Sequence, residues 1–190
     1  MNKRGITLYE LLIAMAIIGL TAVLVVPSLG AMVQRYRLKA SAREISQFLL
    51  QARTEAVKNA NYYKPIFYRV VFNKDKRTYY MEKYEKTSSG TDTWQLVGME
   101  FKLPANITIA ELVNANNYPL TEKDYYYFRP DGSMVCDTQI LGNKGWVPED
   151  GFENPVPVVS KIKLKNAKNN QYQVSLYSET GLTEVQEGWK

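Results

Sequence analysis

The sequence predicts an α+β protein in which one long N-terminal helix precedes a head built from antiparallel strands. Two observations support this prediction. Residues 11–26 are almost entirely apolar, and a helical repeat of apolar residues continues from there to about residue 60. Beyond that point, β-branched and aromatic residues form short runs separated by turn residues. A helix followed by successive strands, without alternation between the two, is typical of the α+β class.

The first half of the helix, residues 6–33, is predicted to be a hydrophobic membrane or filament-core segment. It is apolar on every face, which argues against a helix buried on one side of a soluble core. Sixteen or more apolar residues at ~1.5 Å each approach the ~30 Å thickness of the hydrocarbon core of a bilayer. Pro27 lies inside this pattern and is predicted to kink the helix, because proline lacks an N–H group and its ring clashes with the preceding turn.

The second half, residues 34–60, is predicted to be amphipathic. Its apolar residues recur at spacings of three and four, which places them on one face of a helix, while most of the charged residues fall elsewhere. We expect this apolar stripe to lie on the head, and Asn59 and Asn61 to mark the end of the helix. The stripe consists of Leu38, Ala42, Ile45, Phe48, Leu49, Ala52 and Ala56.

The remaining residues, 61–190, are predicted to form a β-rich globular head. Two strands over 66–72 and 78–84 are joined by a polar turn, and 158–165 pairs with 172–177 as a hairpin. Other predicted strands cover 94–103, 107–109 and 125–128, and a long irregular loop covers 137–157. Between them, Pro130 and Gly132 have the types and spacing that a tight turn requires.

Composition limits both the domain count and the chemistry. With about 55 residues in the helix, the rest suffices for one domain of about 130 residues. The net charge of +5 is mild and by itself predicts no polyanion partner. There is no histidine, and Cys136 is the single cysteine, so one chain offers neither a cysteine–histidine zinc site nor a cysteine–histidine nucleophile. It also offers no internal disulfide.

Glu10 is the most unusual residue of the N-terminal segment. A carboxylate there costs roughly 2–3 kcal/mol toward the bilayer centre, and the nearby cations Lys3 and Arg4 lie on the other side of Gly5. A secretory signal peptide with a cleavage site at residues 28–30 is one alternative, but a glutamate is unusual there and the helical pattern continues past that site. A plain signal anchor is another, and it leaves Glu10 unexplained.

Residues 5–10, read as Gly-Ile-Thr-Leu-Tyr-Glu after a short basic start, closely resemble the class III signal of type IV pilins and of the pseudopilins of type II secretion systems. The resemblance implies that a prepilin peptidase removes a leader of residues 1–5 by cutting between Gly5 and Ile6. It also implies that Ile6 is then N-methylated, and that Glu10 meets the amine of a neighbouring subunit in a filament.

Three further segments, residues 49–58, 128–132 and 178–182, resemble the GspH/FimT family of minor pilins and pseudopilins. The implied function is that of a structural minor subunit of a type II secretion pseudopilus or a type IV pilus, not an enzyme. It needs no cofactor and no small-molecule substrate. The implied partners are prepilin peptidase and other pilin or pseudopilin subunits, and the chain is expected to cross the inner membrane once with its head outside. A DNA-binding minor pilin for DNA uptake and a pilus adhesin are the alternatives.

Lys161, Lys163 and Lys165 fall on one face of a predicted strand and would allow weak contact with nucleic-acid phosphates. The simpler interpretation is the solvated face of an edge strand that lysines protect from mispairing. DNA-binding relatives use an arginine-bearing C-terminal motif, whereas residues 182–190 contain two glutamates and no arginine. A nucleic-acid partner is therefore not expected.

No metal site is predicted. The acidic residues of the head are scattered through its loops, and those of the 137–157 loop lack the Asp-x-Asp-x-Asp-Gly order of a calcium loop. Without histidine, any general base would have to be one of these carboxylates. They are Asp124, Asp131, Asp137, Glu149, Asp150 and Glu153.

Overall fold

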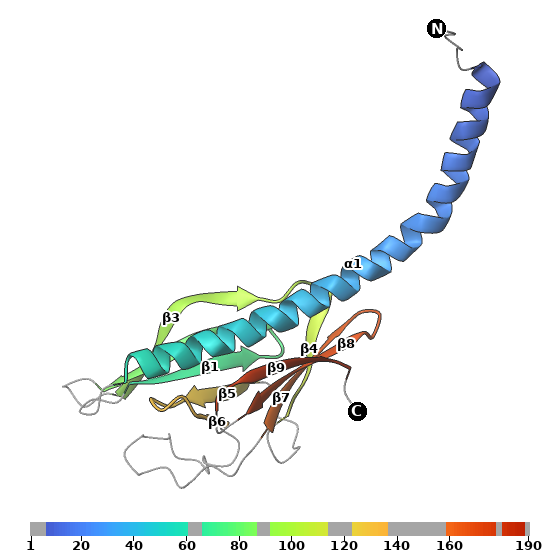
Figure 1. The fold of residues 1–190 in the computed structure, drawn as a ribbon. Coiled ribbons are helices and arrows are strands. Elements are labelled where there is room, and N and C mark those ends of the chain that lie inside the picture. Colours follow the sequence, from blue (N-terminus) through green and yellow to red (C-terminus); the bar gives the residue numbers. More distant parts are fainter. Residues whose placement is uncertain are drawn as a thin grey trace. The chain divides into compact units, whose positions relative to one another are not determined.

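The computed structural model describes residues 7–60, 66–86, 92–113, 123–136, 159–177 and 180–188. For some of these, Pro27 and Cys136 among them, it describes only the backbone. The chain divides into two compact units, Met1–Arg37 and Leu38–Lys190. Helix α1, Leu8–Lys58, continues from the first unit into the second (Figure 1).

The boundaries of α1 agree with the sequence pattern. The helix ends at Lys58, where the Asn59 amide N–H donates to the Glu55 carbonyl oxygen at 3.0 Å and the Asn59 side chain donates to the same oxygen at 2.9 Å. Helical structure continues through Pro27. The kink there stays a prediction.

In the first unit, the described large apolar side chains of α1 are exposed. Leu8 is 78% and Leu20 is 70% exposed, with Leu11, Leu12 and Ile18 between them also exposed. Within the part of the chain that the structure describes, no helix meets the length and hydropathy needed to cross a membrane.

In the second unit, the amphipathic half of α1 buries the predicted stripe. Six of its seven residues are fully buried, and Phe48 is partly buried against the same core. The whole stripe can be buried together because spacings of three and four keep its side chains on one face over five turns of helix. The six are Leu38, Ala42, Ile45, Leu49, Ala52 and Ala56.

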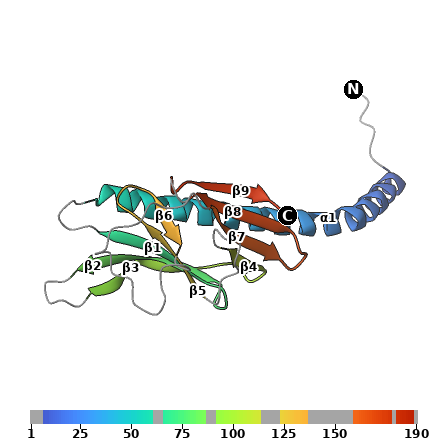
Figure 2. The same ribbon diagram turned by 90° about the horizontal axis from the view of Figure 1, so that it is seen from below.

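The described strands form two antiparallel sheets (Figures 1 and 2). The five-stranded sheet has the order β3-β2-β1-β5-β6 and the four-stranded sheet the order β4-β7-β8-β9. The strands are β1 Phe67–Asn73, β2 Thr78–Lys86, β3 Asp92–Lys102, β4 Ile107–Val113, β5 Lys123–Phe128, β6 Met134–Cys136, β7 Val159–Asn166, β8 Gln171–Tyr177 and β9 Thr183–Glu187.

The α+β class and both predicted hairpins are confirmed. Phe67 pairs with Tyr84 across the first hairpin, and Val159 pairs with Tyr177 across the second. Two short strands, β6 and β9, do not follow from the sequence pattern. β6 has only three residues, and β9 has no fully buried residue, so neither produces a clear apolar alternation.

One core holds α1 and both sheets together in the second unit. Side chains of the α1 stripe share a single buried cluster with Val70, Phe72 and Tyr126 of the five-stranded sheet and with Leu164 and Val174 of the four-stranded sheet. Aromatic rings fill the space where α1 meets the larger sheet: the Phe48 ring lies 5.1 Å from Tyr79 and 5.2 Å from Phe101, centroid to centroid, in edge-to-face geometry. The three layers therefore form one packing unit.

Candidate assembly segment and the contacts that hold the head

Glu10 and Thr7 form a capping box at the start of α1. Glu10 Oε2 accepts hydrogen bonds from the Thr7 amide N–H and from Thr7 Oγ1, each at 2.9 Å. The Glu10 amide N–H donates to Thr7 Oγ1 at 3.3 Å in return. Such a reciprocal pair satisfies two donors at a helix start, and Thr-x-x-Glu is its sequence signature.

This capping box was missed in the interpretation of the sequence, although its spacing is visible there. It gives Glu10 hydrogen-bond partners, and because Thr7 is neutral these bonds bring no opposite charge to the carboxylate. The carboxylate is held at the N-terminal end of a helix, where the exposed N–H groups favour a negative charge. Gly5 and Ile6 lie outside the described residues, so cleavage and methylation there stay predictions.

In the head, Arg53 joins the three segments that resemble the GspH/FimT family. Arg53 belongs to α1, and its Nε donates to the carbonyl oxygen of Gly132 at 3.1 Å and to that of Thr180 at 2.7 Å. The single Nε–H is thus shared between two fixed carbonyl oxygens, as in a three-centre hydrogen bond. The helix end, the turn at 128–132 and the segment around residue 180 thus meet at one side chain.

Two glycines allow that close approach. Gly181 has φ +60°, and a Cβ atom there would lie 2.3 Å from the Gly132 carbonyl oxygen, far inside contact distance. Gly132 has φ +84°, and its Cβ would lie 3.1 Å from Arg53 Nη2. A side chain at residue 181 would therefore meet both backbone strain and a clash with backbone.

The predicted turn after β5 has the expected geometry. The Arg129 amide N–H donates to the Ser133 carbonyl oxygen and the Gly132 amide N–H donates to the Arg129 carbonyl oxygen, both at 2.9 Å. Asp131 Oδ1 accepts from the Ser133 amide N–H at 2.8 Å and from Ser133 Oγ at 2.6 Å. Arg129 is 8% exposed, and burial lowers the pKa of its guanidinium. Asp131, one of the scattered acids, therefore shapes a turn.

The prediction that the lysine stripe lies on an edge strand is wrong. β7 pairs with β4 on one side and with β8 on the other, so it is an inner strand of its sheet. The pairing with β4 joins segments about 50 residues apart, which local sequence patterns do not reveal. Lys163 Nζ lies 2.8 Å from Glu111 Oε2 of β4, while Lys161 is partly buried and Lys165 is exposed. An ion pair thus occupies the middle of the stripe.

Two tyrosines of β5, Tyr125 and Tyr127, belong to an aromatic cluster around Arg69 of β1. The Arg69 guanidinium carbon lies 3.9 Å from the centroid of the Trp94 ring and 4.6 Å from that of Tyr125. Its Nε donates to Glu82 Oε2 at 2.6 Å. Strand pairing places these side chains on one face of the sheet, since Arg69 lies opposite both Glu82 and Tyr127.

Among the described residues, no group of three or more His, Cys, Asp or Glu side chains is arranged to hold a metal ion. The carboxylates of the 137–157 loop lie outside the described residues, and so does most of the segment that a calcium site would need.

Comparison with known proteins identifies the start of the chain. Residues 1–26 match the family described as the prokaryotic N-terminal methylation motif. No curated protein gives a significant match. Among solved structures, the crystal structure of the minor pseudopilin EpsH from the type II secretion system of Vibrio cholerae aligns with 80% of this chain and 97% of its own chain, at 14% identity and a TM-score of 0.49.

The matched segment contains Gly5, Ile6, Thr7 and Glu10, the residues on which the resemblance to a prepilin signal rests. The chain therefore carries a prokaryotic N-terminal methylation motif, as the likeness of its first residues to pilin and pseudopilin signals predicted.

Proposed function

We propose that this chain is a minor subunit of a type II secretion pseudopilus or a type IV pilus. The observation that carries the proposal is the N-terminal methylation motif on a helix whose described apolar side chains are exposed over its first turns. Exposed leucines and isoleucines over that length are stable only in a bilayer or against other apolar helices. Pilin and pseudopilin subunits are typically not enzymes, and we assign no catalytic role to this chain.

In this proposal the chain is stored in the inner membrane with its head outside. Prepilin peptidase removes residues 1–5, and the new amine at Ile6 becomes N-methylated. On assembly, Glu10 of one subunit meets the amine of a neighbour, a charge-assisted contact in a low-dielectric core. The capping box with Thr7 prepares this step because it holds the carboxylate at the helix start before a partner arrives.

The first test concerns processing. Replacing Gly5 with leucine should leave the leader attached, because the peptidase must approach the main chain closely at that position. An immunoblot for the mobility shift on cleavage measures this. Normal cleavage of Gly5→Leu would refute the signal assignment.

The second test concerns assembly. Glu10→Val should leave the chain cleaved and in the membrane, since the change makes the helix more apolar, yet the subunit should be lost from sheared filaments. Thr21→Val is the matched control, because Thr21 Oγ1 donates only to the carbonyl oxygens of its own helix, at Ile17 and Ile18. Wild-type amounts of Glu10→Val in the shear fraction would contradict the role of Glu10.

A further inference from the structure

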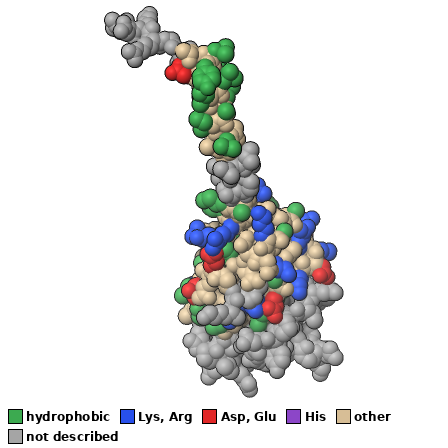
Figure 3. All heavy atoms as spheres, turned by 90° about the vertical axis from the view of Figure 1, so that its right-hand side faces the viewer, with side chains coloured by type: hydrophobic (Ala, Val, Ile, Leu, Met, Phe, Trp, Pro, Cys, Tyr) green, Lys and Arg blue, Asp and Glu red, His purple; other side chains and the backbone are tan. Residues whose placement is uncertain are grey.

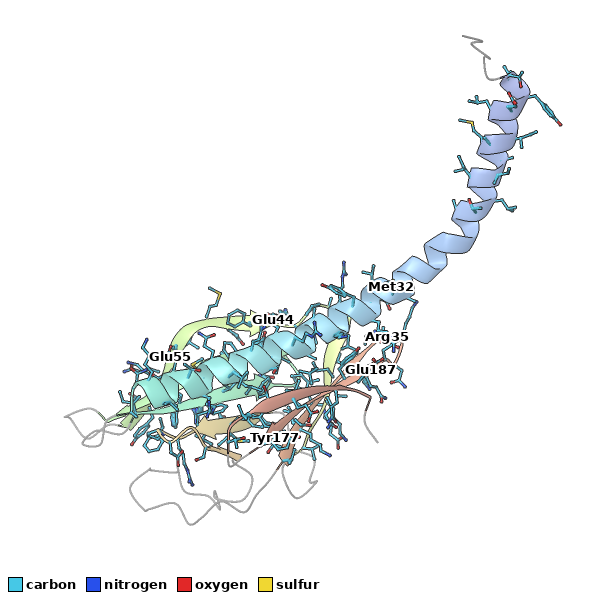
Figure 4. The ribbon with its side chains drawn as sticks, viewed as in Figure 1. Met32, Arg35, Glu44, Glu55, Tyr177 and Glu187 are labelled. Atoms are coloured by element: carbon cyan, nitrogen blue, oxygen red, sulfur yellow. The ribbon has the colours of Figure 1, made fainter. Side chains whose placement is uncertain are left out.

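The end of the head at which α1 enters, near Leu38, can be located from contacts within the second unit. β1 runs antiparallel to α1, because Asn59 Nδ2 donates to Tyr68 Oη near the start of β1 at 2.9 Å. At the other end of the hairpin, Tyr79 at the start of β2 lies against Phe48 and forms a hydrogen bond with Glu44 (Figure 4). The β1–β2 turn at residues 74–77 therefore lies at the Leu38 end.

The smaller sheet places a second turn at the same end. Thr180 bonds to Arg53, and three residues later Thr183 Oγ1 lies 2.6 Å from Ser46 Oγ, so the chain runs back along α1 toward Leu38. β9 continues in this direction, and Glu187 pairs with Tyr172 directly after the β7–β8 turn.

Direct contacts join these turns into one surface, which we call the proximal end and define as residues 74–77, 100–106, 165–170 and 187. The Leu103 amide N–H donates to the Arg77 carbonyl oxygen at 2.9 Å, and the Arg77 side chain donates to the Ala105 carbonyl oxygen. Ile107 then pairs with Asn166 at the base of the β7–β8 turn.

The proximal end is basic. It carries six basic residues, Lys74, Lys76, Arg77, Lys102, Lys165 and Lys168, against the three acidic residues Asp75, Glu100 and Glu187. Lys76, Lys102, Lys165 and Lys168 are exposed. Figure 3 shows Lys and Arg side chains gathered on the viewed face of the head, with fewer Asp and Glu side chains among them. An anionic partner therefore fits this surface.

A shallow hollow of about 320 Å³ lies within the proximal end, lined by Thr108, Lys165, Asn166 and Asn169 among others. Asn166 is 5% exposed. Its Oδ1 accepts from the amide N–H groups of Lys168 and Asn170, each at 3.0 Å, and its buried Nδ2 has no hydrogen-bond partner. Asn166 therefore holds the β7–β8 turn that carries Lys165 and Lys168, while its buried Nδ2 has too little exposed surface to contact a ligand.

We propose that the proximal end binds the headgroups of anionic phospholipids, with the exposed lysines Lys165 and Lys168 of the β7–β8 turn beside the phosphates. The proposal rests on the proposed function, in which residues 6–33 lie in the membrane. Four residues, 34–37, lie between residue 33 and Leu38. Even fully extended, the five Cα–Cα steps reach no more than about 18 Å, so chain connectivity keeps Leu38 within that distance of the membrane segment.

The nearness of Leu38 to the membrane segment, together with the positive charge, favours a lipid surface as the occupant. Basic residues close to an anionic bilayer each raise affinity by about fivefold, and the effect fades within a Debye length of ~10 Å at 0.1 M salt. Such binding holds the head against the membrane while the subunit is stored there. When the subunit leaves the membrane and joins a filament, the contacts between the head and the lipid headgroups are lost.

The test uses the full chain in vesicles, with the head on the outside. In vesicles with 30% phosphatidylglycerol, the rates at which a water-soluble amine reagent modifies Lys76, Lys102 and Lys168 should be at least threefold lower than in pure phosphatidylcholine vesicles. Lys58 is the internal control, because it is exposed at the opposite end of the same amphipathic helix. At 1 M salt, where the Debye length is ~3 Å, the difference should vanish.

Two variants sharpen the test. Asn166→Asp keeps the oxygen that accepts from Lys168 and Asn170, so the turn should form, but it adds a negative charge beneath the basic surface. We expect it to reduce the protection of Lys168 at least twofold while circular dichroism stays unchanged. Replacing Lys76, Lys102 and Lys168 together with glutamate should prevent the protection of Lys165, whereas Lys58→Glu should not.

Equal modification rates in the two kinds of vesicle would overturn the lipid proposal. So would equal protection of the same lysines by duplex DNA in phosphatidylcholine vesicles at 0.15 M salt, which would assign the surface to nucleic acid. Neither result would touch the proposed function, because leader cleavage and filament incorporation are measured separately in the Gly5 and Glu10 variants.

Discussion

The two halves of α1 have similar helical structure but opposite relations to the rest of the chain. In the first half, large apolar side chains such as Leu8 and Leu20 remain mostly exposed. In the second half, six residues of the apolar stripe are completely buried against two sheets: Leu38, Ala42, Ile45, Leu49, Ala52 and Ala56. The described apolar side chains of the first half are therefore not covered by this chain, whereas those of the stripe in the second half are covered within it.

The difference teaches that apolar content alone does not tell where a helix is stable. What separates the halves is the arrangement of the apolar residues: on every face up to residue 26, and on one face from residue 38 onward. A helix that is apolar all round must be surrounded, and a helix with one stripe needs only a sheet beneath it. Substitutions in each half should therefore affect different properties of the protein.

The largest expected effect on head stability comes from Leu49→Ala. Leu49 is fully buried, so its truncation should lower the free energy of unfolding of the head by about 2–5 kcal/mol. Leu12→Ala removes the same atoms from an exposed site in the first half and should leave the head unchanged. Denaturant titration of the full chain in detergent micelles, followed by tryptophan fluorescence, measures both. Equal losses would contradict the division of α1 into two halves.

Gly181→Ala should be next in size. Its left-handed φ and the 2.3 Å approach of a Cβ to the Gly132 carbonyl oxygen predict a loss of about 2–4 kcal/mol. Gly188→Ala is a matched control: Gly188 also has a left-handed φ, at +75°, but a Cβ there meets nothing within 4 Å. The control should lose only about 1 kcal/mol, the cost of the backbone conformation alone. If both variants unfold at the same denaturant concentration, the clash with residue 132 does not matter.

Much of the fold could be predicted from the sequence because its signals are local. Periodicity of three and four located the buried stripe, and Pro130 with Gly132 located a turn whose glycine indeed has a positive φ. The position of β7 inside its sheet could not be predicted, because its partner β4 is distant in sequence. The contacts of Arg53 could not be predicted for the same reason. The three segments that each resemble the GspH/FimT family are far apart in sequence and come together only in the folded chain.

In the candidate assembly segment, by contrast, the sequence reveals the site itself and not its partner. Its motif is readable from the first residues, and the capping box between Thr7 and Glu10 follows from their spacing. The proposed partner of Glu10 belongs to another subunit, and no property of this chain's own packing specifies it.

Arg53→Met tests whether the meeting point of those three segments stabilises the head. Methionine keeps much of the apolar stem but removes the donor that serves the carbonyl oxygens of Gly132 and Thr180. We expect a loss of about 1–2 kcal/mol, since partly buried acceptors then lose a charged donor. Arg43→Met is the control at an exposed position of the same helix and should change stability by less than about 0.5 kcal/mol. A loss that is as large for Arg43→Met would show that charge, not the bonds of Arg53, is responsible.

The smallest expected effect is a pH dependence at Tyr79, where the second half of α1 covers the larger sheet. Burial, and then the nearby Glu44 carboxylate, raise the pKa of the Tyr79 hydroxyl above its ordinary value of 10.0. A raised folded-state pKa means that the stabilisation is fully present below pH 10.0 and is lost as the pH rises above it, because the unfolded chain then releases the proton first. One such group contributes a slope of at most about 1.4 kcal/mol per pH unit. Tyr79→Phe should remove that part of the alkaline slope. At neutral pH it should lower the free energy of unfolding by about 1 kcal/mol, because the hydrogen bond to Glu44 is lost.

Tyr177→Phe is the comparison. The pKa of Tyr177 is also raised, by its hydrogen bond to Glu184, but at an exposed site where solvent screens the effect (Figure 4). Unfolding titrations from pH 8 to 11 should therefore show a shallower slope for Tyr79→Phe than for Tyr177→Phe. Parallel slopes would mean that the contact between α1 and the sheet does not hold Tyr79 in its neutral form.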